Sequence, residues 1–445
     1  MKDMTTGPVR GHVLSMMAFM LFGMVLQTLY ALIDIYWVGQ LGKEAVAAVA
    51  LASNLMFLVL ALSQSLAVGA VALISQAFGR KDEATVQRLF NQSQSLSALA
   101  ALLFLLIGWL GKASYAQQLA SDAQTARLAV DFLNWFIPAQ ALLFLMTGLG
   151  AALRGTGNMK PGLIVQTASV LVNMALAPIL ILGWGTGQAL GVAGAGLATF
   201  IATLFAVVGL SLYLARAGTY LRVDFAQWRP DWATWRRMLS IGLPSGTEFL
   251  LVSVILALVY VVIRPFGAEA QAGFGIGMRI LQAGFMPAVA ISFAVAAVAG
   301  QNLGAGLGER VRQSFSEAAR LAIGFMLIFT VLCQFAAGSL VAVFSDDPAV
   351  VHVGSDYLRV ISWSCVASGL VMAATGLFQG LGNTLPSLLA SASRLLTFVL
   401  PVLWLSQQQA FALHQVWWLS TSSVFLQMLL ALLLLRREFA RRLPT

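Results

Sequence analysis

Long apolar runs separated by short polar connections dominate this sequence. A helix needs about 20 predominantly apolar residues to cross a bilayer, and twelve runs meet that length or come close to it. Because several runs are longer than one span requires, we expect those helices to tilt, bend or extend beyond the membrane. The predicted spans cover 13–37, 45–76, 89–110, 128–149, 163–182, 192–214, 241–263, 270–298, 315–343, 357–378, 388–405 and 411–435. The pattern predicts an all-α polytopic membrane protein.

Composition and charge support this fold class and add an orientation. Of the 445 residues, 59% are hydrophobic and 10% are charged, whereas soluble proteins carry about 25% charged residues. Most Lys and Arg residues lie in connections on the same side as the N-terminus, while the opposite side carries only Lys43, Lys112 and Arg264. Basic residues mark the cytoplasmic side, so we expect both termini in the cytoplasm. The net charge of +9 therefore reflects orientation and not nucleic-acid binding.

The longest hydrophilic connection runs from Arg216 to Arg237. Its Trp and Arg residues predict an amphipathic segment that lies on the inner membrane face. The connection divides the chain into a six-helix lobe at 1–215, a cytoplasmic linker at 216–238 and a second six-helix lobe at 239–445.

The two halves repeat at a constant offset of 225 residues. Gln76 and Gly79 recur as Gln301 and Gly304, and the segment from Gly155 to Pro161 recurs from Gly380 to Pro386. Each half has an even number of predicted spans, so the repeats run in the same direction through the membrane. Such repeats are related by an axis along the membrane normal, with the substrate path between them.

Signatures of soluble enzymes are missing from the sequence. It has no P-loop, no metal-ligand pattern and no evident nucleophile–base pair. Cys333 and Cys365 both lie in apolar runs, so they indicate no disulfide framework. A membrane protein with two repeats and no nucleotide site is most simply a gradient-driven carrier, and not an enzyme with a bound cofactor.

Asp34 is the main candidate for chemistry, because it is a carboxylate inside the first span. A charge at membrane depth costs about 2.5–3.5 kcal/mol on insertion scales and usually faces a cavity. An isolated carboxylate in a partly dry cavity can hold a proton or an organic cation, and this competition is the basis of proton–cation antiport. The alternative is that Asp34 lies near the outer end of its helix and reaches the headgroups.

Further ionisable groups lie in the second half. Glu248 follows the Gly-Leu-Pro-Ser-Gly-Thr stretch of the seventh span, where it could line the substrate cavity or act as an N-terminal helix carboxylate. Arg279 and Arg394 could also line the cavity, or one of them could form a structural ion pair with Glu248. We interpret Asp356 as structural, paired with Arg359 one turn later. The polar residues that could complete a site in the first half are Gln27, Tyr30, Asn54, Gln64, Asn173 and Thr199.

Several stretches together resemble the multidrug and toxic compound extrusion (MATE) family. They are Asp34-x-x-Trp-Val-Gly-Gln-Leu-Gly42, Arg154-Gly-Thr-Gly-Asn158, Gly191-Val-Ala-Gly-Ala-Gly-Leu-Ala-Thr199, Gly242-Leu-Pro-Ser-Gly-Thr-Glu248 and the run from Arg279 to Gly306. The resemblance implies twelve helices in two lobes around a central cavity. It also implies export of cationic or amphipathic drugs in exchange for H⁺ or Na⁺. We expect a monomer in the bacterial inner membrane. The acidic first span combined with this seventh span is similar to the DinF-like branch.

In that branch the ion-coupling site of the first lobe resembles Asp34, Tyr30, Asn173 and Thr199. Many relatives carry an acid one turn after the asparagine, where this chain has Ala177. A missing carboxylate disfavours Na⁺, because hard cations prefer several oxygen ligands. We therefore expect H⁺ as the coupling ion.

Two other functions stay open at this stage. A lipid-linked oligosaccharide flippase has a similar fold and needs a cationic cavity for pyrophosphate, to which Arg279 and Arg394 could contribute. Asp34 and the count of twelve spans argue against that function. A membrane-embedded enzyme is the third alternative, and no catalytic constellation supports it.

Overall fold

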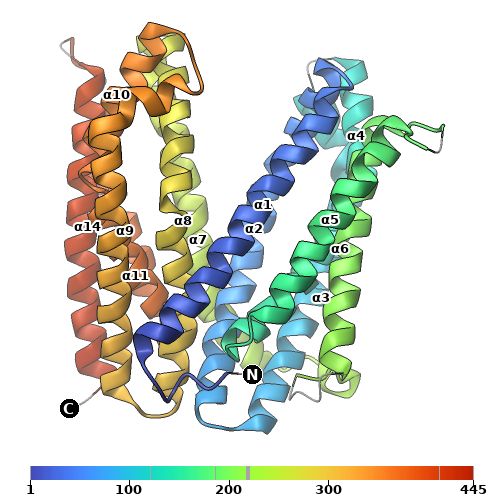
Figure 1. Cartoon of the computed structure of the whole chain (residues 1–445), viewed down its shortest axis with the longest axis vertical. Coiled ribbons are helices and arrows are strands. Elements are labelled where there is room, and N and C mark those ends of the chain that lie inside the picture. The colour runs from blue at the N-terminus through green and yellow to red at the C-terminus, as the bar shows by residue number, and fades with distance from the viewer. Residues whose placement is uncertain (1, 121, 186, 217–220, 410, 444–445) are drawn as a thin grey trace. The chain divides into compact units, whose positions relative to one another are not determined.

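A computed structural model describes residues 2–120, 122–185, 187–216, 221–409 and 411–443, without the side chain of Ser53. The regular elements of these residues are all helical (Figure 1). Among the described residues, eleven helical stretches are long and apolar enough to cross a membrane, with Leu385–Leu405 counted as one, and a bent pair of shorter helices brings the number to twelve. The elements are α1 (Val9–Gly39), α2 (Lys43–Gly79), α3 (Glu83–Leu119), α4 (Ala123–Gly155), α5 (Lys160–Leu182), α6 (Gly191–Arg216), η1 (Phe225–Trp228), α7 (Trp232–Ile263), η2 (Arg264–Phe266), α8 (Ala268–Gly304), α9 (Gly308–Ala342), α10 (Pro348–Ser362), α11 (Cys365–Leu381), α12 (Leu385–Arg394), η3 (Leu395–Val399), α13 (Leu400–Leu405) and α14 (Leu413–Arg442). The prediction of an all-helical polytopic membrane protein is confirmed.

Two spans that the sequence predicts as single runs are interrupted. The tenth span consists of α10 and α11, which are bent by 57° at a short break. At this break the Ser364 hydroxyl donates a hydrogen bond of 2.8 Å to the carbonyl of Ile361. The eleventh span passes from α12 through the π-helical turn η3 into α13, whose first turn contains Pro401. Proline lacks an N–H and crowds the preceding turn, and a wider turn before it accommodates both effects.

The repeat predicted from the sequence is visible in helix boundaries and turns. Helices α2 and α8 begin and end at positions exactly one repeat apart. The glycines that precede them, Gly42 and Gly267, have φ angles of 105° and 97°. After α4 and α11, Gly157 and Gly382 have φ angles of 73° and 71°. An L-residue with a side chain rarely adopts this conformation, so both halves use glycine for the same turns.

By contacts, the chain forms two compact units whose limits lie inside helices. The first unit contains Phe19–Gly246 and the residues before Met4, and the second contains Met4–Ala18 and the chain from Thr247 onward. The first part of α1 therefore packs within the second unit, and the first part of α7 packs within the first unit. The division at 1–215 and 239–445 stays a prediction from the sequence repeat, and residues 217–220 of its linker lie outside the described residues.

In the first unit, α7 approaches α2 closely through glycine. A Cβ atom at Gly242 would lie 1.8 Å from the carbonyl oxygen of Ser65, and one at Gly69 would lie 2.3 Å from that of Met238. Gly246 is equally constrained, because its Cβ would lie 1.9 Å from the Ser65 hydroxyl. Small residues of this kind let two membrane helices bring their backbones together.

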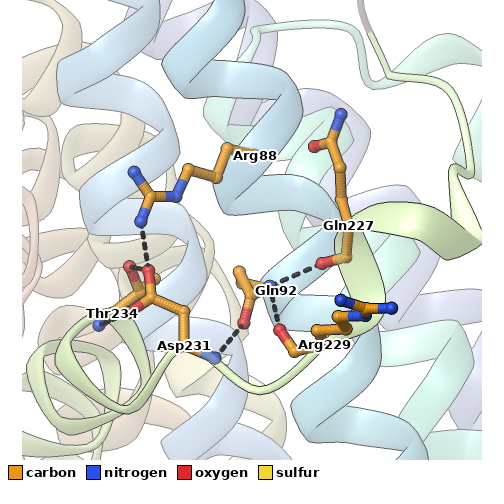
Figure 2. Close-up of polar contacts among 6 residues, drawn as sticks. All are labelled: Arg88, Gln92, Gln227, Arg229, Asp231 and Thr234. Carbon is orange, nitrogen blue, oxygen red and sulfur yellow. Dashed lines mark hydrogen bonds and ion pairs between the residues drawn. The ribbon is translucent and has the colours of Figure 1, made fainter.

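The segment before α7 is fastened to the start of α3. Gln92 donates from Nε2 to the carbonyls of Gln227 and Arg229 at 2.5 and 2.9 Å, and it accepts from the N–H of Asp231 at 3.0 Å (Figure 2). Asn91 adds a contact to the carbonyl of Arg222 at 3.0 Å. These amide side chains give the irregular backbone the hydrogen bonds that a helix would otherwise supply.

In the second unit, the segment before α1 is fastened in a comparable way. The N–H of Met4 donates to Oε1 of Gln301 at 3.0 Å. The carbonyl of Met4 accepts from Asn302 and from Arg310, each at 3.2 Å, and Arg310 also donates to the carbonyl of Gly7 at 2.9 Å. Both entry segments are thus held by polar side chains, although the side chains involved do not correspond in the two repeats.

Candidate functional site

Three of the residues predicted to form the ion-coupling site lie together in the first unit. The hydroxyl groups of Tyr30 on α1 and Thr199 on α6 share a hydrogen bond of 2.9 Å. Nδ2 of Asn173 on α5 donates to the Tyr30 hydroxyl at 3.5 Å. Thr199 also donates to the carbonyl of Ala195 at 3.1 Å, one turn back on its own helix. The cluster therefore joins three helices that the chain reaches at widely separated positions.

Asp34 lies one helical turn after Tyr30, on the same face of α1. The carboxylate of Asp34 is close enough to the Tyr30 hydroxyl to interact with it electrostatically. Its Oδ1 atom is buried and has no hydrogen-bond partner among the described residues. A buried acceptor without a partner costs about 1–3 kcal/mol, and protonation would turn that acceptor into a donor.

Asn173 contributes a second acceptor of the same kind. Its side chain is fully buried, and its Oδ1 atom has no hydrogen-bond partner in the described part of the chain. One turn later the buried Ala177 packs in the core of the unit beside Ile181. Among the described residues, no three His, Cys, Asp or Glu side chains are grouped closely enough to hold a metal ion.

The other polar candidates of the first half do not join this cluster. Gln27 and Asn54 are exposed, Gln64 is partly buried, and within the described residues none is hydrogen-bonded to Asp34. Asn54 instead contacts the hydroxyl of Tyr115 on α3.

Glu248 occupies a separate polar network in the second unit. Its carboxylate accepts from Ser387 at 2.9 Å and from Ser391 at 2.5 Å, both on α12. Gln427 of α14 donates to the Ser391 hydroxyl at 3.1 Å, and Thr375 of α11 shares a hydrogen bond of 2.8 Å with Ser387. The sequence identifies Glu248 as a candidate but not its partners. The available signal was the spacing of Ser387 and Ser391, which lie one turn apart on a strongly amphipathic helix.

The suggested ion pair between Glu248 and an arginine is wrong, because serines satisfy both carboxylate oxygens. Arg394 donates from Nη2 to Ser420 at 3.2 Å and lies over the ring of Phe398, with 5.6 Å from its Cζ to the ring centroid. Its Nε atom is buried and has no partner among the described residues. Arg279 is exposed on α8.

The suggested pair of Asp356 with Arg359 is also wrong. Within the described residues, the ionisable partner of Asp356 is His352, whose Nδ1 lies 3.4 Å from the carboxylate. Arg359 contributes its backbone carbonyl to Gln334 of α9 at 2.7 Å.

Comparisons with known proteins agree over nearly the whole chain. A family model described as MatE matches twice, at residues 20–179 and 244–405. The probable multidrug resistance protein YoeA of Bacillus subtilis is 26% identical over 372 residues, covering 82% of this chain and 80% of the relative. A FAD transporter of Shewanella oneidensis is 26% identical over 425 residues, covering 90% of each.

The fold is also that of a solved structure. A crystal structure of MATE in the straight conformation superposes with a TM-score of 0.91 and 22% sequence identity, covering 100% of this chain and 99% of that one. At this level of identity the likeness establishes the fold. The two family matches fall on the two halves of the sequence repeat.

Proposed function

The chain belongs to the MatE family, whose members are membrane transporters and not enzymes, and from this premise we propose that it exports drug-like organic cations in exchange for protons that bind at Asp34. The proposal includes Tyr30, Asn173 and Thr199 as the groups that position this site. It also includes the orientation expected from the basic residues, with both termini in the cytoplasm.

The observation that carries the proposal is the unpartnered buried oxygen of Asp34. Its neighbours on α5 and α6 hydrogen-bond Tyr30, so they hold the cluster while Oδ1 stays without a partner. A proton or an organic cation can each satisfy this oxygen, and binding of one disfavours binding of the other. Such competition at a membrane-embedded carboxylate allows two opposing fluxes to be coupled.

We favour H⁺ over Na⁺ because few oxygen ligands surround the carboxylate. A hard cation such as Na⁺ prefers several oxygen ligands. Beside Asp34, the proposed site contains the oxygens of Tyr30, Asn173 and Thr199, and Ala177 stands where many members of the resembling branch carry a second acid. The acidic first span and the Gly-Leu-Pro-Ser-Gly stretch further favour a place in the DinF-like branch.

The substrate is proposed at the level of its chemistry. Relatives of this chain carry names that refer to multidrug resistance and to FAD. The positive charge of an organic cation such as ethidium complements the Asp34 carboxylate, so we propose organic cations as the preferred substrates. FAD carries phosphates and is a suitable anionic comparison.

Transport by purified protein in proteoliposomes tests the proposal. We expect ethidium movement under an imposed pH gradient with sodium absent, and no movement when the pH gradient is collapsed. Movement that requires a sodium gradient would contradict the assignment of H⁺. Movement of FAD but not of any organic cation would contradict the substrate class, and absence of movement with either gradient for any substrate would contradict the function.

A further inference from the structure

A cavity of about 250 Å³ lies in the first unit at the end that the basic residues assign to the cytoplasm. It is formed where α2 ends and where α3 and α7 begin. The residues that line it are Leu73, Gln76, Arg80, Thr85, Arg88, Leu89, Asp231, Ala233, Thr234 and Arg237. Three of the four charged residues in this set are arginines.

The arginines differ in how far their charges are already balanced. Arg88 pairs with Asp231, with 2.6 Å between Nη2 and Oδ2 (Figure 2). The Thr234 hydroxyl donates to the same carboxylate oxygen at 2.6 Å. Arg80 and Arg237 are exposed, and within the described residues neither side chain has a hydrogen bond or an ion pair. Hydrogen bonds from Thr85, and to the smallest extent the nearby Arg80, lower the pKa of the Asp82 carboxyl. The cavity therefore keeps an excess of positive charge.

Backbone dipoles add to this charge. Helices α3 and α7 both begin at the cavity, at Glu83 and Trp232. The N-terminus of a helix presents free N–H groups and a partial positive charge. Asp82 and Asp231 each accept an N–H of these first turns, which leaves other N–H groups of the same turns directed toward this end of the unit.

The equivalent place in the second repeat shows how such arginines can be satisfied. Arg310 corresponds to Thr85 in the repeat, and Gln301 corresponds to Gln76. Arg310 donates to the carbonyl oxygens of Met4 and Gly7, which belong to the segment before α1. In the first unit Arg80 and Arg237 have no corresponding protein oxygen among the described residues. An oxygen-rich anion would supply the acceptors that the chain supplies in the second unit.

The surroundings of the cavity favour an anion that carries hydrocarbon. The same three helices, together with Ile137 of α4, line a largely apolar cavity of about 470 Å³ that includes Leu66, Leu96 and Leu243. This cavity lies about two turns before the basic one on α2 and about two turns after it on α3. Phe225 and Trp232, close to the basic cavity in sequence, are 74% and 73% exposed. Exposed aromatic side chains at the end of a membrane helix are typical of the lipid interface.

We propose that Arg80 and Arg237 in this cavity bind the phosphate group of an anionic membrane phospholipid. Basic pockets between membrane helices on the cytoplasmic side are suited to such headgroups. Arg88 positions Asp231 at the start of α7, so bound phosphate would lie beside the segment that leads into this helix. This site is separate from the cluster around Asp34 and is independent of the transported substrate.

Ligand-induced stabilisation of the full chain, purified in a neutral detergent, tests the proposal. The thermal midpoint is measured against dihexanoyl phosphatidylglycerol, dihexanoyl phosphatidylcholine, glycerol phosphate and inorganic phosphate. We expect phosphatidylglycerol to raise the midpoint in a saturable way and the other three to act weakly or not at all. Equal stabilisation by glycerol phosphate or inorganic phosphate would assign the site to a soluble phosphate and overturn the lipid. No saturable effect of any anion would overturn the site.

Substitution of the cavity arginines tests whether phosphatidylglycerol binds in this cavity. Arg80→Gln combined with Arg237→Gln should weaken phosphatidylglycerol binding about thirtyfold, and each single substitution about fivefold. Arg236→Gln is the matched control, because Arg236 is an exposed neighbour that does not line the cavity. If the double variant is not monodisperse, the single variants decide. Binding that is unchanged in them, or equally weakened in the control, would overturn the proposal.

Discussion

Tyr30 and Thr199 are joined hydroxyl to hydroxyl at 2.9 Å, although 169 positions separate them in the chain. This bond fixes the face of α1 that carries Asp34 against α6. The Tyr30 hydroxyl is bonded to Thr199 and to Asn173, and within the described residues neither Tyr30 nor Asn173 donates a hydrogen bond to the buried Oδ1 atom of Asp34. In the proposed site, Tyr30, Asn173 and Thr199 therefore position α1, whereas the Asp34 carboxylate exchanges a proton for an organic cation.

Replacing Asp34 with Asn should abolish proton-coupled export while the protein still folds. The amide cannot take up or release a proton, and it removes the charge that attracts an organic cation. Ethidium efflux from loaded cells and the level of purified protein are the two measurements. Asp131→Asn is a suitable control, since Asp131 is exposed in the third turn of α4. Normal efflux by the Asp34 variant would remove this residue from the mechanism.

Removing the Tyr30 and Thr199 hydroxyls should reveal a coupled pair. Hydrogen bonds between membrane helices contribute about 0.6 kcal/mol on average and up to about 1.7 kcal/mol. We expect Tyr30→Phe and Thr199→Val to be non-additive by about this amount in a double-mutant cycle. Unfolding of the four proteins in detergent gives the coupling energy. Strictly additive effects would mean that the bond does not stabilise the unit.

Substitutions of Glu248 can separate the contribution of its charge to stability from the contribution of its hydrogen bonds. Serine hydroxyls can donate or accept, so Glu248→Gln should leave stability nearly unchanged. Glu248→Ala leaves Ser387 and Ser391 without their buried acceptor and should destabilise by about 1–3 kcal/mol. Thermal unfolding of both variants distinguishes the two effects. Should the Gln variant be as unstable as the Ala variant, the negative charge itself stabilises the network.

The spans and the repeat could be predicted because they depend on local sequence. A run of apolar residues determines its own helix, and the glycines at 42, 157, 267 and 382 are required by the φ angles of individual turns. The constant offset of 225 residues can then be recognised by matching residue types between the two halves of the sequence. These features need no knowledge of which helices touch.

The partners of buried polar groups could not be predicted in the same way. Ser387 and Ser391 meet Glu248 only because α7 and α12 pack within one unit, across about 140 positions. The sequence also did not reveal that α1 and α7 each divide between two units. At the break near Ser364 no proline or glycine interrupts the helix. The bend is accompanied by hydrogen bonds from side chains to the backbone, including those of Ser364 to the carbonyl of Ile361 and of Thr330 to the carbonyl of Ser362.

Acid should weaken the start of α7 through Asp231. The hydroxyl of Thr234, followed by Arg88, holds the pKa of this carboxyl below its usual value. A folded-state pKa that is lowered stabilises the protein above the unfolded value of about 3.9, and this stabilisation is lost as pH falls through the folded value. Between pH 5 and pH 3 the thermal midpoint should therefore fall more steeply for wild type than for Asp231→Asn. Asp346→Asn, at an exposed carboxylate, should retain the wild-type slope. Identical slopes for all three proteins would show that Asp231 makes no such contribution.

Substituting Gly242 with Ala should destabilise the first unit. Its Cβ would lie 1.8 Å from the carbonyl oxygen of Ser65, which is backbone and cannot rotate away. Overpacking of this kind typically costs about 1–3 kcal/mol, because α2 and α7 must move apart and lose contacts along both helices. Thermal unfolding of the purified variant measures the loss.

Gly111 on α3 provides the matched control for this substitution. A Cβ atom there would have no neighbour within 4 Å. Alanine in the interior of a helix is more stable than glycine by about 0.5–1 kcal/mol, so Gly111→Ala should be neutral or slightly stabilising. If Gly242→Ala were as stable as this control, the close approach of α7 to Ser65 would not be a constraint on the fold. The opposite signs expected for the two substitutions follow from one difference, which is whether another backbone occupies the space beside the glycine.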